Sequence, residues 1–211
     1  MSPGMHRATI DSMPSESYSE TITVPAAVRF PVELEPPDGF SPDDPASWPR
    51  IPGRLEYVGG KLLYMPPCGD VQQQVTVSVV GVLDRWLDDH AGFVVGGNEA
   101  GMLFGRDVRG AEAAVWPRAV LGPRTGGYVR VPPLLAVEVA GREENEAALR
   151  AKAEWYLAHG VHVVWIVLPA VREVVVVMPT GERRYGSRDT IDAHPELPGL
   201  APSVERFFRQ L

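Results

Sequence analysis

Apolar residues recur with two different periods along most of the chain, and the two periods separate predicted strands from predicted helices. RLEYVGGKLLYM has two β-prone runs around Gly59 and Gly60, which permit a tight turn. This predicts a hairpin with Glu56 roughly opposite Leu63. In VQQQVTVSVVGVLDRWLDDHAG the apolar residues recur at helical spacing and stop at a glycine, which predicts a helix despite the many valines. Residues 93–121 predict two irregular strands interrupted by glycines.

The second half of the chain has clearer signals. It predicts, in order, a strand at 134–140, a helix at about 143–159, strands at 162–168 and 172–178, and a short helix in PSVERFFRQL. The runs HVVWIVL and REVVVVM lack alternation, as expected of strands that are covered on both faces. We therefore expect an α/β fold, with a mixed central β-sheet flanked by helices, in a domain that covers residues 50–211.

The first 49 residues have a different composition. MSPGMHRATIDSMPSESYSETITVP is rich in Ser, Pro and Thr and has too little apolar surface to offset its ordering entropy. The segment ELEPPDGFSPDDPASWPRIPG is rich in proline, which excludes a long helix or a central strand. Residues 1–49 are therefore predicted to be an arm that is partly disordered and that ends in a linker or a wrapping segment.

Composition restricts the classes of function. The 211 residues are 45% hydrophobic, which suits one globular domain, and no apolar run approaches the roughly 20 residues that cross a bilayer. Without a signal-peptide pattern, we expect a cytoplasmic protein with no membrane partner. The net charge of −7 and the lack of a Lys/Arg run do not favour a nucleic-acid partner. Cys68 is the single cysteine, and the five histidines have no metal-ligand spacing.

One acidic residue lies inside a run that otherwise predicts a buried strand: Glu138 in LLAVEVAG. A buried carboxylate must be paired, protonated, metal-bound or placed at an opening of the sheet, because an unpaired buried charge costs several kcal/mol. A second acid, Glu112 in VRGAEAAVWPR, shares a strand face with small or apolar residues such as Ala114 and Trp116. Two carboxylates on neighbouring strands would suit Mg²⁺ or Mn²⁺.

The helix that follows Glu138 carries a lysine on the face predicted to pack on the sheet. Lys152 shares this face with Leu149, Ala153 and Tyr156. The lysine could extend its charge to the surface, form an ion pair with Glu138, or act in catalysis beside metal-bound carboxylates. In the catalytic case it would position or help to deprotonate a water and offset charge on an attacked phosphate.

The order of these segments resembles a known family. GRLEYVGGKLLYMPP, VRGAEAAVWPR, LLAVEVAG, RAKAEWYLAHGVHVVWIVLP and LPGL follow one another as in the Uma-type family of restriction endonuclease-like proteins, within the PD-(D/E)XK nuclease superfamily. The resemblance covers about residues 50–210. Its most specific part is a Lys-x-x-x-Tyr helix followed by Gly-Val and an apolar strand, matched by Lys152, Tyr156, Gly160, Val161 and Trp165.

The resemblance implies a restriction endonuclease-like core and a role for several residues. Glu138 corresponds to the strand-borne glutamate, and Lys152 to a lysine that has moved from the strand to the next helix, since Ala140 stands where Glu-x-Lys would place it. Glu56 corresponds to the acid before the hairpin glycine, and Glu56 and Gln72 are the candidates for an outer part of the site.

Three positions depart from the family pattern. Ala111-Glu112 replaces the usual Pro-Asp, Gln72 stands where a histidine commonly opens the first helix, and Gly141 replaces a serine. The longer Glu112 side chain shifts its oxygens by about a bond length, which a tight octahedral magnesium site tolerates poorly.

Two functional hypotheses follow. The first is a metal-dependent endonuclease that hydrolyses phosphodiester bonds in DNA, with Mg²⁺ or Mn²⁺ held by Glu112 and Glu138 and with Lys152 orienting the water. The second is a non-catalytic homodimeric scaffold or binding protein that retains the nuclease fold, with Glu138 and Lys152 as an internal ion pair. The position of Glu112 separates the two: the nuclease hypothesis gains if Glu112 converges on the same point and loses if it faces solvent.

Overall fold

The computed structural model describes residues 30–142 and 144–211. In chain order its helices and strands are β1 (Val32–Leu34), η1 (Pro45–Ser47), β2 (Arg54–Val58), β3 (Lys61–Met65), α1 (Asp70–Leu87), β4 (Phe93–Phe104), β5 (Asp107–Pro117), η2 (Arg118–Val120), β6 (Leu135–Val139), α2 (Glu146–Ala158), β7 (Val163–Leu168), β8 (Glu173–Met178), β9 (Gly181–Tyr185) and η3 (Val204–Phe208). The hairpin predicted at Gly59-Gly60 is present as β2 and β3, with Glu56 opposite Leu63.

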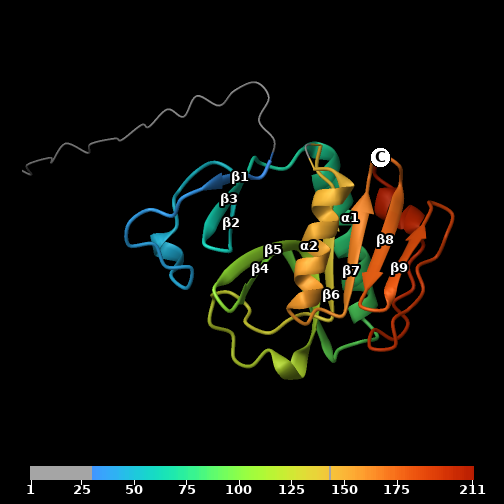
Figure 1. Cartoon of the computed structure of the whole chain (residues 1–211). Helices are drawn as coiled ribbons and strands as arrows, with labels where there is room; N and C mark the ends of the chain where they lie inside the picture. The colour runs from blue at the N-terminus through green and yellow to red at the C-terminus, as the bar shows by residue number, and fades with distance from the viewer. Residues whose placement is uncertain (1–29, 143) are drawn as a thin grey trace, which may run out of the picture.

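The nine strands of the described residues form one mixed sheet (Figure 1). The strand order is β1-β3-β2-β5-β6-β7-β8-β9, and β4 pairs with β5 beside this path. Strands β6 and β7 are parallel and are connected through α2, whereas the other pairings are antiparallel. The predicted α/β fold with a mixed central sheet flanked by helices is confirmed.

Helices α1 and α2 cover opposite faces of the sheet (Figure 1). On one face, α1 and η3 pack on the odd-numbered residues of β6, Leu135, Val137 and Val139. On the other face, Leu149 and Tyr156 of α2 pack on Ala136. Because side chains alternate along a strand, the face that buries Ala136 also receives Glu138. This places Glu138 under α2.

Strand β5 changes its partner in the middle of the sheet. It pairs with β6 through Ala113, Ala114 and Val115, and with β2 through Val108. On its other side, β4 has a bulge between Gly97 and Ala100, where Asn98 and Glu99 adopt positive φ angles of 54° and 58°.

The bulge explains one incorrect detail of the sequence analysis. Strict alternation would place Glu112 on the same face as Ala114 and Trp116. Instead, Ala111 and Ala114 both pack in the cluster beneath α2, so the alternation is interrupted between them. Glu112 therefore lies in the gap where β5 leaves β6.

The proline-rich segment wraps around one end of the sheet. Its strand β1 adds to β3, and Phe40 and Trp48 pack against Tyr57 and Tyr128. The sheet thus extends into the part of the chain that precedes residue 50. The predicted disorder of the arm falls mainly on residues 1–29, which lie outside the described residues.

Other elements differ from the sequence prediction in detail. Strands β1 and β9 were not predicted, and the C-terminal helix is the short 3₁₀ helix η3. Among the described residues, no helix is long and apolar enough to cross a membrane.

Candidate active site

Glu138 lies at the centre of the candidate site. It projects from β6, is 1% exposed, and accepts hydrogen bonds from two residues of α2. Lys152 Nζ lies 2.8 Å from Oε2, and the Tyr156 hydroxyl donates to Oε1 at 2.8 Å. Lysine and tyrosine are four residues apart, so they occupy the same helix face. Each carboxylate oxygen therefore has a donor, which is what a buried charge requires.

Lys152 also connects Glu138 to the hairpin. Its Nζ lies 3.5 Å from Glu56 Oε1, and Arg109 donates to the other oxygen of Glu56 at 2.9 Å. Burial alone would lower the pKa of Lys152, but the charges of Glu138 and Glu56 outweigh this effect and raise its pKa. Lys152 is therefore a stable cation. Burial and the negative charge of Glu138 likewise raise the pKa of Tyr156, so its hydroxyl remains a donor.

Glu112 lies beside this group and is 5% exposed. Its Oε1 accepts hydrogen bonds from Arg54 at 3.0 Å and from Gln72 at 2.9 Å, and its Oε2 accepts one from the Val139 backbone N–H at 3.3 Å. Strands β5 and β6 are antiparallel, and their pairing ends with Ala113 opposite Val137. Glu112 and Glu138 are the next residues beyond this pair, one on each strand. The Glu112 side chain thus fills the gap between the diverging strands.

The electrostatics of Glu112 reflect this position. Burial and the negative charge of Glu138 raise its pKa to about 8, although Lys152 and Arg54 act in the opposite direction. Two carboxyl groups that share one buried region cannot both ionise easily unless more positive charge is supplied. The protonation state of Glu112 therefore depends on whether additional positive charge is bound beside it.

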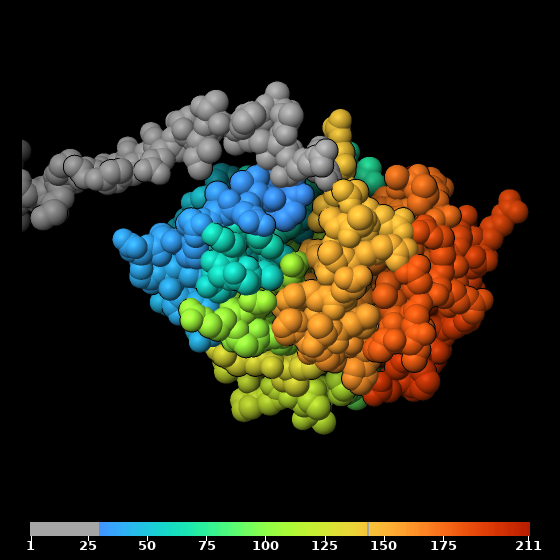
Figure 2. All heavy atoms as spheres, viewed as in Figure 1, coloured from blue at the N-terminus to red at the C-terminus, as the bar shows by residue number. Residues whose placement is uncertain are grey.

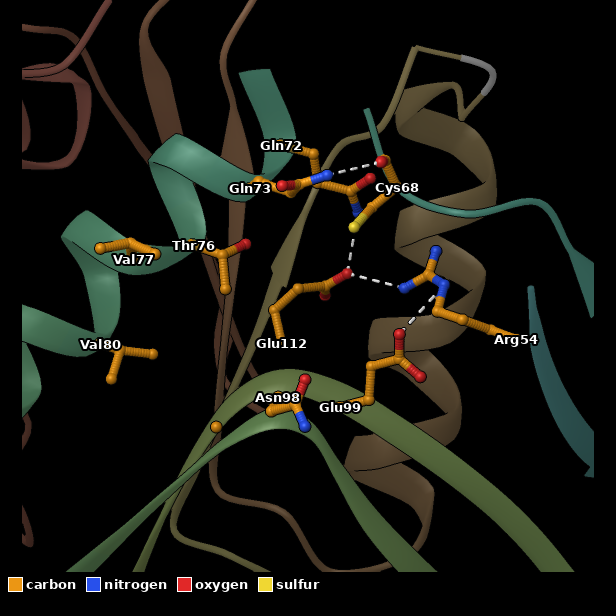
Figure 3. A pocket seen from close by; sticks show the side chains of 11 residues that line it. Arg54, Cys68, Gln72, Gln73, Thr76, Val77, Val80, Asn98, Glu99 and Glu112 are labelled. Atoms are coloured by element: carbon orange, nitrogen blue, oxygen red, sulfur yellow. Dashed lines mark hydrogen bonds and ion pairs between the residues drawn. The ribbon is translucent and has the colours of Figure 1, made fainter. Parts of the chain in front are cut away.

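Glu112 also lines an open pocket of about 510 Å³ between α1 and the bulge of β4 (Figure 3). Figure 3 shows Gln72, Cys68 and Arg54 around the Glu112 carboxylate, with Asn98 and Glu99 below it. The Arg54 Nε lies 3.6 Å from Glu99 Oε1 and is a buried donor without a hydrogen bond. Burial raises the pKa of Glu99. The candidate site thus opens to solvent on the Glu112 side.

The structure brings together the five residues that the sequence analysis selected. Glu112, Glu138 and Lys152 form the centre, Glu56 contacts Lys152, and Gln72 contacts Glu112. Their roles in chemistry stay predictions.

Sequence reasoning assigned no site role to four other residues. These are Arg54, Glu99, Arg109 and Tyr156. Only Tyr156 had a usable signal, its place four residues after Lys152, whereas Glu99 reaches the site through a bulge that no local pattern predicts.

The residues present suit a hard divalent cation of the Mg²⁺ type. Mg²⁺ is commonly held by one or two carboxylates and keeps several waters. Glu112 and Glu138 supply two carboxylates, and the raised pKa of Glu112 results partly from a repulsion that such a cation would relieve. Among the residues that the structure describes, no group of three or more His, Cys, Asp or Glu is placed to hold a metal, so the protein would contribute few ligands.

A mixed sheet with helices on both faces and an acidic cluster at its centre is the architecture of the restriction endonuclease-like class. The fold resembles the crystal structure of "a putative nuclease belonging to DUF820 from Anabaena variabilis ATCC 29413", with a TM-score of 0.69 and 16% identity over 81% of this chain and 98% of that one. The chain belongs to the Uma2 family, described as "Putative restriction endonuclease", which matches residues 45–206. No curated protein matches the chain.

Proposed function

We propose that the protein is a metal-dependent endonuclease that hydrolyses phosphodiester bonds in DNA, with Mg²⁺ or Mn²⁺ as its cofactor. The observation that carries the proposal is the position of Glu112. It is buried next to Glu138 rather than facing solvent, and it also lines the open pocket. An internal ion pair would need only Glu138 and Lys152, so a second buried carboxylate at the same point favours a metal site.

Glu112 and Glu138 would hold the cation. When bound, a divalent cation there polarises the phosphate and makes a water more acidic. Gln72 orients Glu112, because its Nε2 donates both to Glu112 and to the Val139 carbonyl at 3.0 Å. Tyr156 and Lys152 orient Glu138 in the same way, from the opposite face of the sheet.

Lys152 would contribute positive charge and a hydrogen bond rather than act as a base. Its raised pKa keeps it protonated at neutral pH, so it cannot accept a proton from water. A protonated lysine can hold a water in line and offset the charge that develops on the phosphate. Of the roles considered from the sequence, positioning is therefore the one we propose.

A second candidate has one observation in its favour. Lys152 and Tyr156 already satisfy both oxygens of Glu138, as they would in a scaffold that keeps the pair for stability alone. In that case the protein would be a non-catalytic, homodimeric binding protein. An ionised carboxylate has about four lone-pair sites, however, so these two donors leave capacity for a cation.

Calorimetric titration of MgCl₂ and MnCl₂ into the full chain separates the two candidates. Glu112→Gln and Glu138→Gln should each weaken binding at least about tenfold, since each removes a charged ligand. Glu154→Gln is the matched control, because Glu154 is exposed on α2 and should leave binding unchanged. Absence of binding by the parent protein at millimolar metal would support the scaffold.

Cleavage is then measured on circular single-stranded and circular duplex DNA. An endonuclease converts a single-stranded circle to a linear product and a duplex circle to a nicked or linear one, and EDTA should abolish both conversions. Metal binding without any cleavage would leave a metal-binding scaffold and exclude the enzyme.

A further inference from the structure

The candidate site is recessed. Glu56, Glu112, Glu138 and Lys152 are between 1% and 8% exposed, so a phosphate on the outside of a rigid duplex cannot contact them from the surface. Figure 2 shows the surface on one side, where α2 lies against the hairpin and β4–β5 region. Glu112 meets solvent through the pocket between α1 and β4 (Figure 3).

The pocket has the size and lining of a site for a small planar group. Its volume of about 510 Å³ falls within the roughly 300–1,000 Å³ of small-ligand sites. The side chains of Val77 and Val80 form an apolar wall on α1 beside the hydroxyl-bearing Thr76, and Gly97 faces Val80 from β4. Apolar side chains of this kind can pack on the face of a base that has left its stack.

Polar groups lie at the other side of the same pocket. The Gln73 amide nitrogen donates to the Cys68 carbonyl at 3.0 Å, whereas the Asn98 side-chain amide makes no hydrogen bond within the described part of the chain. An amide both donates and accepts, as recognition of a base edge requires. Arg54, whose Nη1 donates to Glu112, adds an Nε that lies 3.6 Å from Glu99 and makes no hydrogen bond. The pocket thus has an apolar surface and a polar edge that suit a base, and beside them a cationic donor that suits the adjoining phosphate.

Global charge argues against recognition of an intact duplex. A protein that holds a duplex through its backbone usually makes several Lys or Arg contacts to phosphates, whereas this chain has a net charge of −7. Binding through a base and a single phosphate needs fewer cations, because apolar contact supplies part of the affinity.

We infer that the pocket between α1 and β4 binds one unpaired nucleotide of a DNA strand, with the base between Val77 and Asn98 and a phosphate directed toward Arg54 and Glu112. The inference rests on the proposed nuclease function and specifies its substrate class as single-stranded or locally unpaired DNA. A paired nucleotide would have to leave its stack to enter, at a cost of a few kcal/mol that an unpaired nucleotide does not incur.

The test measures binding separately from cleavage. Fluorescence anisotropy with a fluorescein-labelled single strand, and with a hairpin duplex that contains the same sequence, gives two dissociation constants for the full chain in CaCl₂ at low ionic strength. The recovered DNA is run on a gel to verify that it is intact. We expect the single strand to bind at least about tenfold more tightly than the duplex.

Two variants locate the binding. Val77→Phe fills the pocket from a position that is 61% exposed, so it should fold normally yet weaken single-strand binding about tenfold. Val120→Phe is the matched control, since Val120 is 47% exposed and lies outside this pocket. Asn98→Gly removes the amide at a positive φ that glycine adopts easily, and it should weaken binding several-fold without loss of fold.

The outcomes distinguish this inference from the nuclease proposal. Equal affinity for the two DNAs, no binding of either, or equal binding by Val77→Phe and Val120→Phe would overturn the inference. Cleavage of the duplex circle as fast as the single-stranded circle would also overturn it, while leaving the nuclease in place. Selective binding of the single strand without cleavage would instead refute the nuclease and leave the pocket as a binding site.

Discussion

The helix α2 contributes to two clusters of charge that differ mainly in their burial. On its inner face, Lys152 joins Glu138 and Glu56 beneath the protein surface. On its outer face, Arg150 pairs with Glu146 and Glu182, and Arg184 of β9 extends the network to Glu173. Lys152 and Arg150 are only two residues apart, so helix geometry sends them to different sides.

Burial gives the two clusters different physical roles. The outer network is partly exposed, with Arg150 lowering the pKa of Glu146 through a hydrogen bond in solvent. Water and salt screen such pairs, which contribute little to stability. In the inner cluster each charge depends on its partner, because no water replaces a lost contact. The comparison shows that, among ion pairs of similar length, the stability of the fold depends strongly only on those that are buried.

The largest effect is expected for Lys152→Met. The change keeps most of the apolar volume but leaves Glu138 and Glu56 without their shared cation, and we expect the free energy of unfolding to fall by about 3–5 kcal/mol. Urea denaturation measures the loss. The double variant Lys152→Met with Glu138→Gln should recover part of it; a double variant less stable than the single one would contradict this account.

Glu112 should make stability depend on pH. Its pKa is about 8 in the folded protein, against 4.5 for an unperturbed glutamate as in the unfolded chain, so the folded state binds the proton more tightly. The resulting stabilisation is fully present below about pH 4.5 and is lost as pH rises to about 8. At about 1.4 kcal/mol per unit of pKa difference, we expect a loss of about 3–4 kcal/mol over this range relative to Glu112→Gln.

Parallel denaturation curves of the parent chain and Glu112→Gln from about pH 5 to about pH 8.5 measure this difference. Because both proteins share every other titrating group, the difference isolates Glu112. If the difference in free energy of unfolding between the two proteins stays constant across the pH range, a raised pKa for this carboxyl group is excluded.

A smaller effect is expected for Tyr156→Phe. The change removes one donor from the buried Glu138 carboxylate, and hydrogen bonds to charged groups contribute about 1.5–3 kcal/mol. We therefore expect a loss of about 2 kcal/mol in thermal or urea denaturation. A variant of unchanged stability would mean that another donor replaces the hydroxyl.

The smallest effect is expected on the outer face. Arg150→Ala removes contacts to Glu146 and Glu182, yet it should change the free energy of unfolding by less than about 1 kcal/mol, because the side chain is partly exposed. High salt should reduce even this difference. A loss as large as that for Lys152→Met would invalidate the distinction between the clusters.

Most of the fold could be predicted from the sequence because its elements follow simple periods. The apolar runs of β7 and β8, the helical spacing in α1 and the glycines of the β2–β3 turn each indicate their element locally. Strand β9 could not be predicted, since GERRY is polar and exposed except for its last residue and depends on pairing with β8. Strand β1 likewise forms only because β3 offers an edge.

The site was predictable to the extent that buried acids stand out in apolar strands. Glu138 and Glu112 drew attention as charges in runs that otherwise pack in the core, and Lys152 through its helix face. The contacts of Arg54 and Glu99 depend on the β4 bulge, a tertiary feature in which two residues with positive φ oppose Glu112. Propensity alone gives no reason for a bulge at Asn98-Glu99, so these partners became visible only in three dimensions.

The spacing of the site residues along the chain has a consequence for the order of folding. Glu138 and Lys152 are 14 residues apart within one β6–α2 unit, whereas the contacts of Arg54 with Glu112 and of Arg109 with Glu56 span 58 and 53 residues. Closing a longer loop costs more entropy, so contacts within the β6–α2 unit are expected to form earlier. When the full chain refolds, the Glu138–Lys152 pair would then form before the hairpin docks, and the complete cluster of site residues would appear only in the last step of folding.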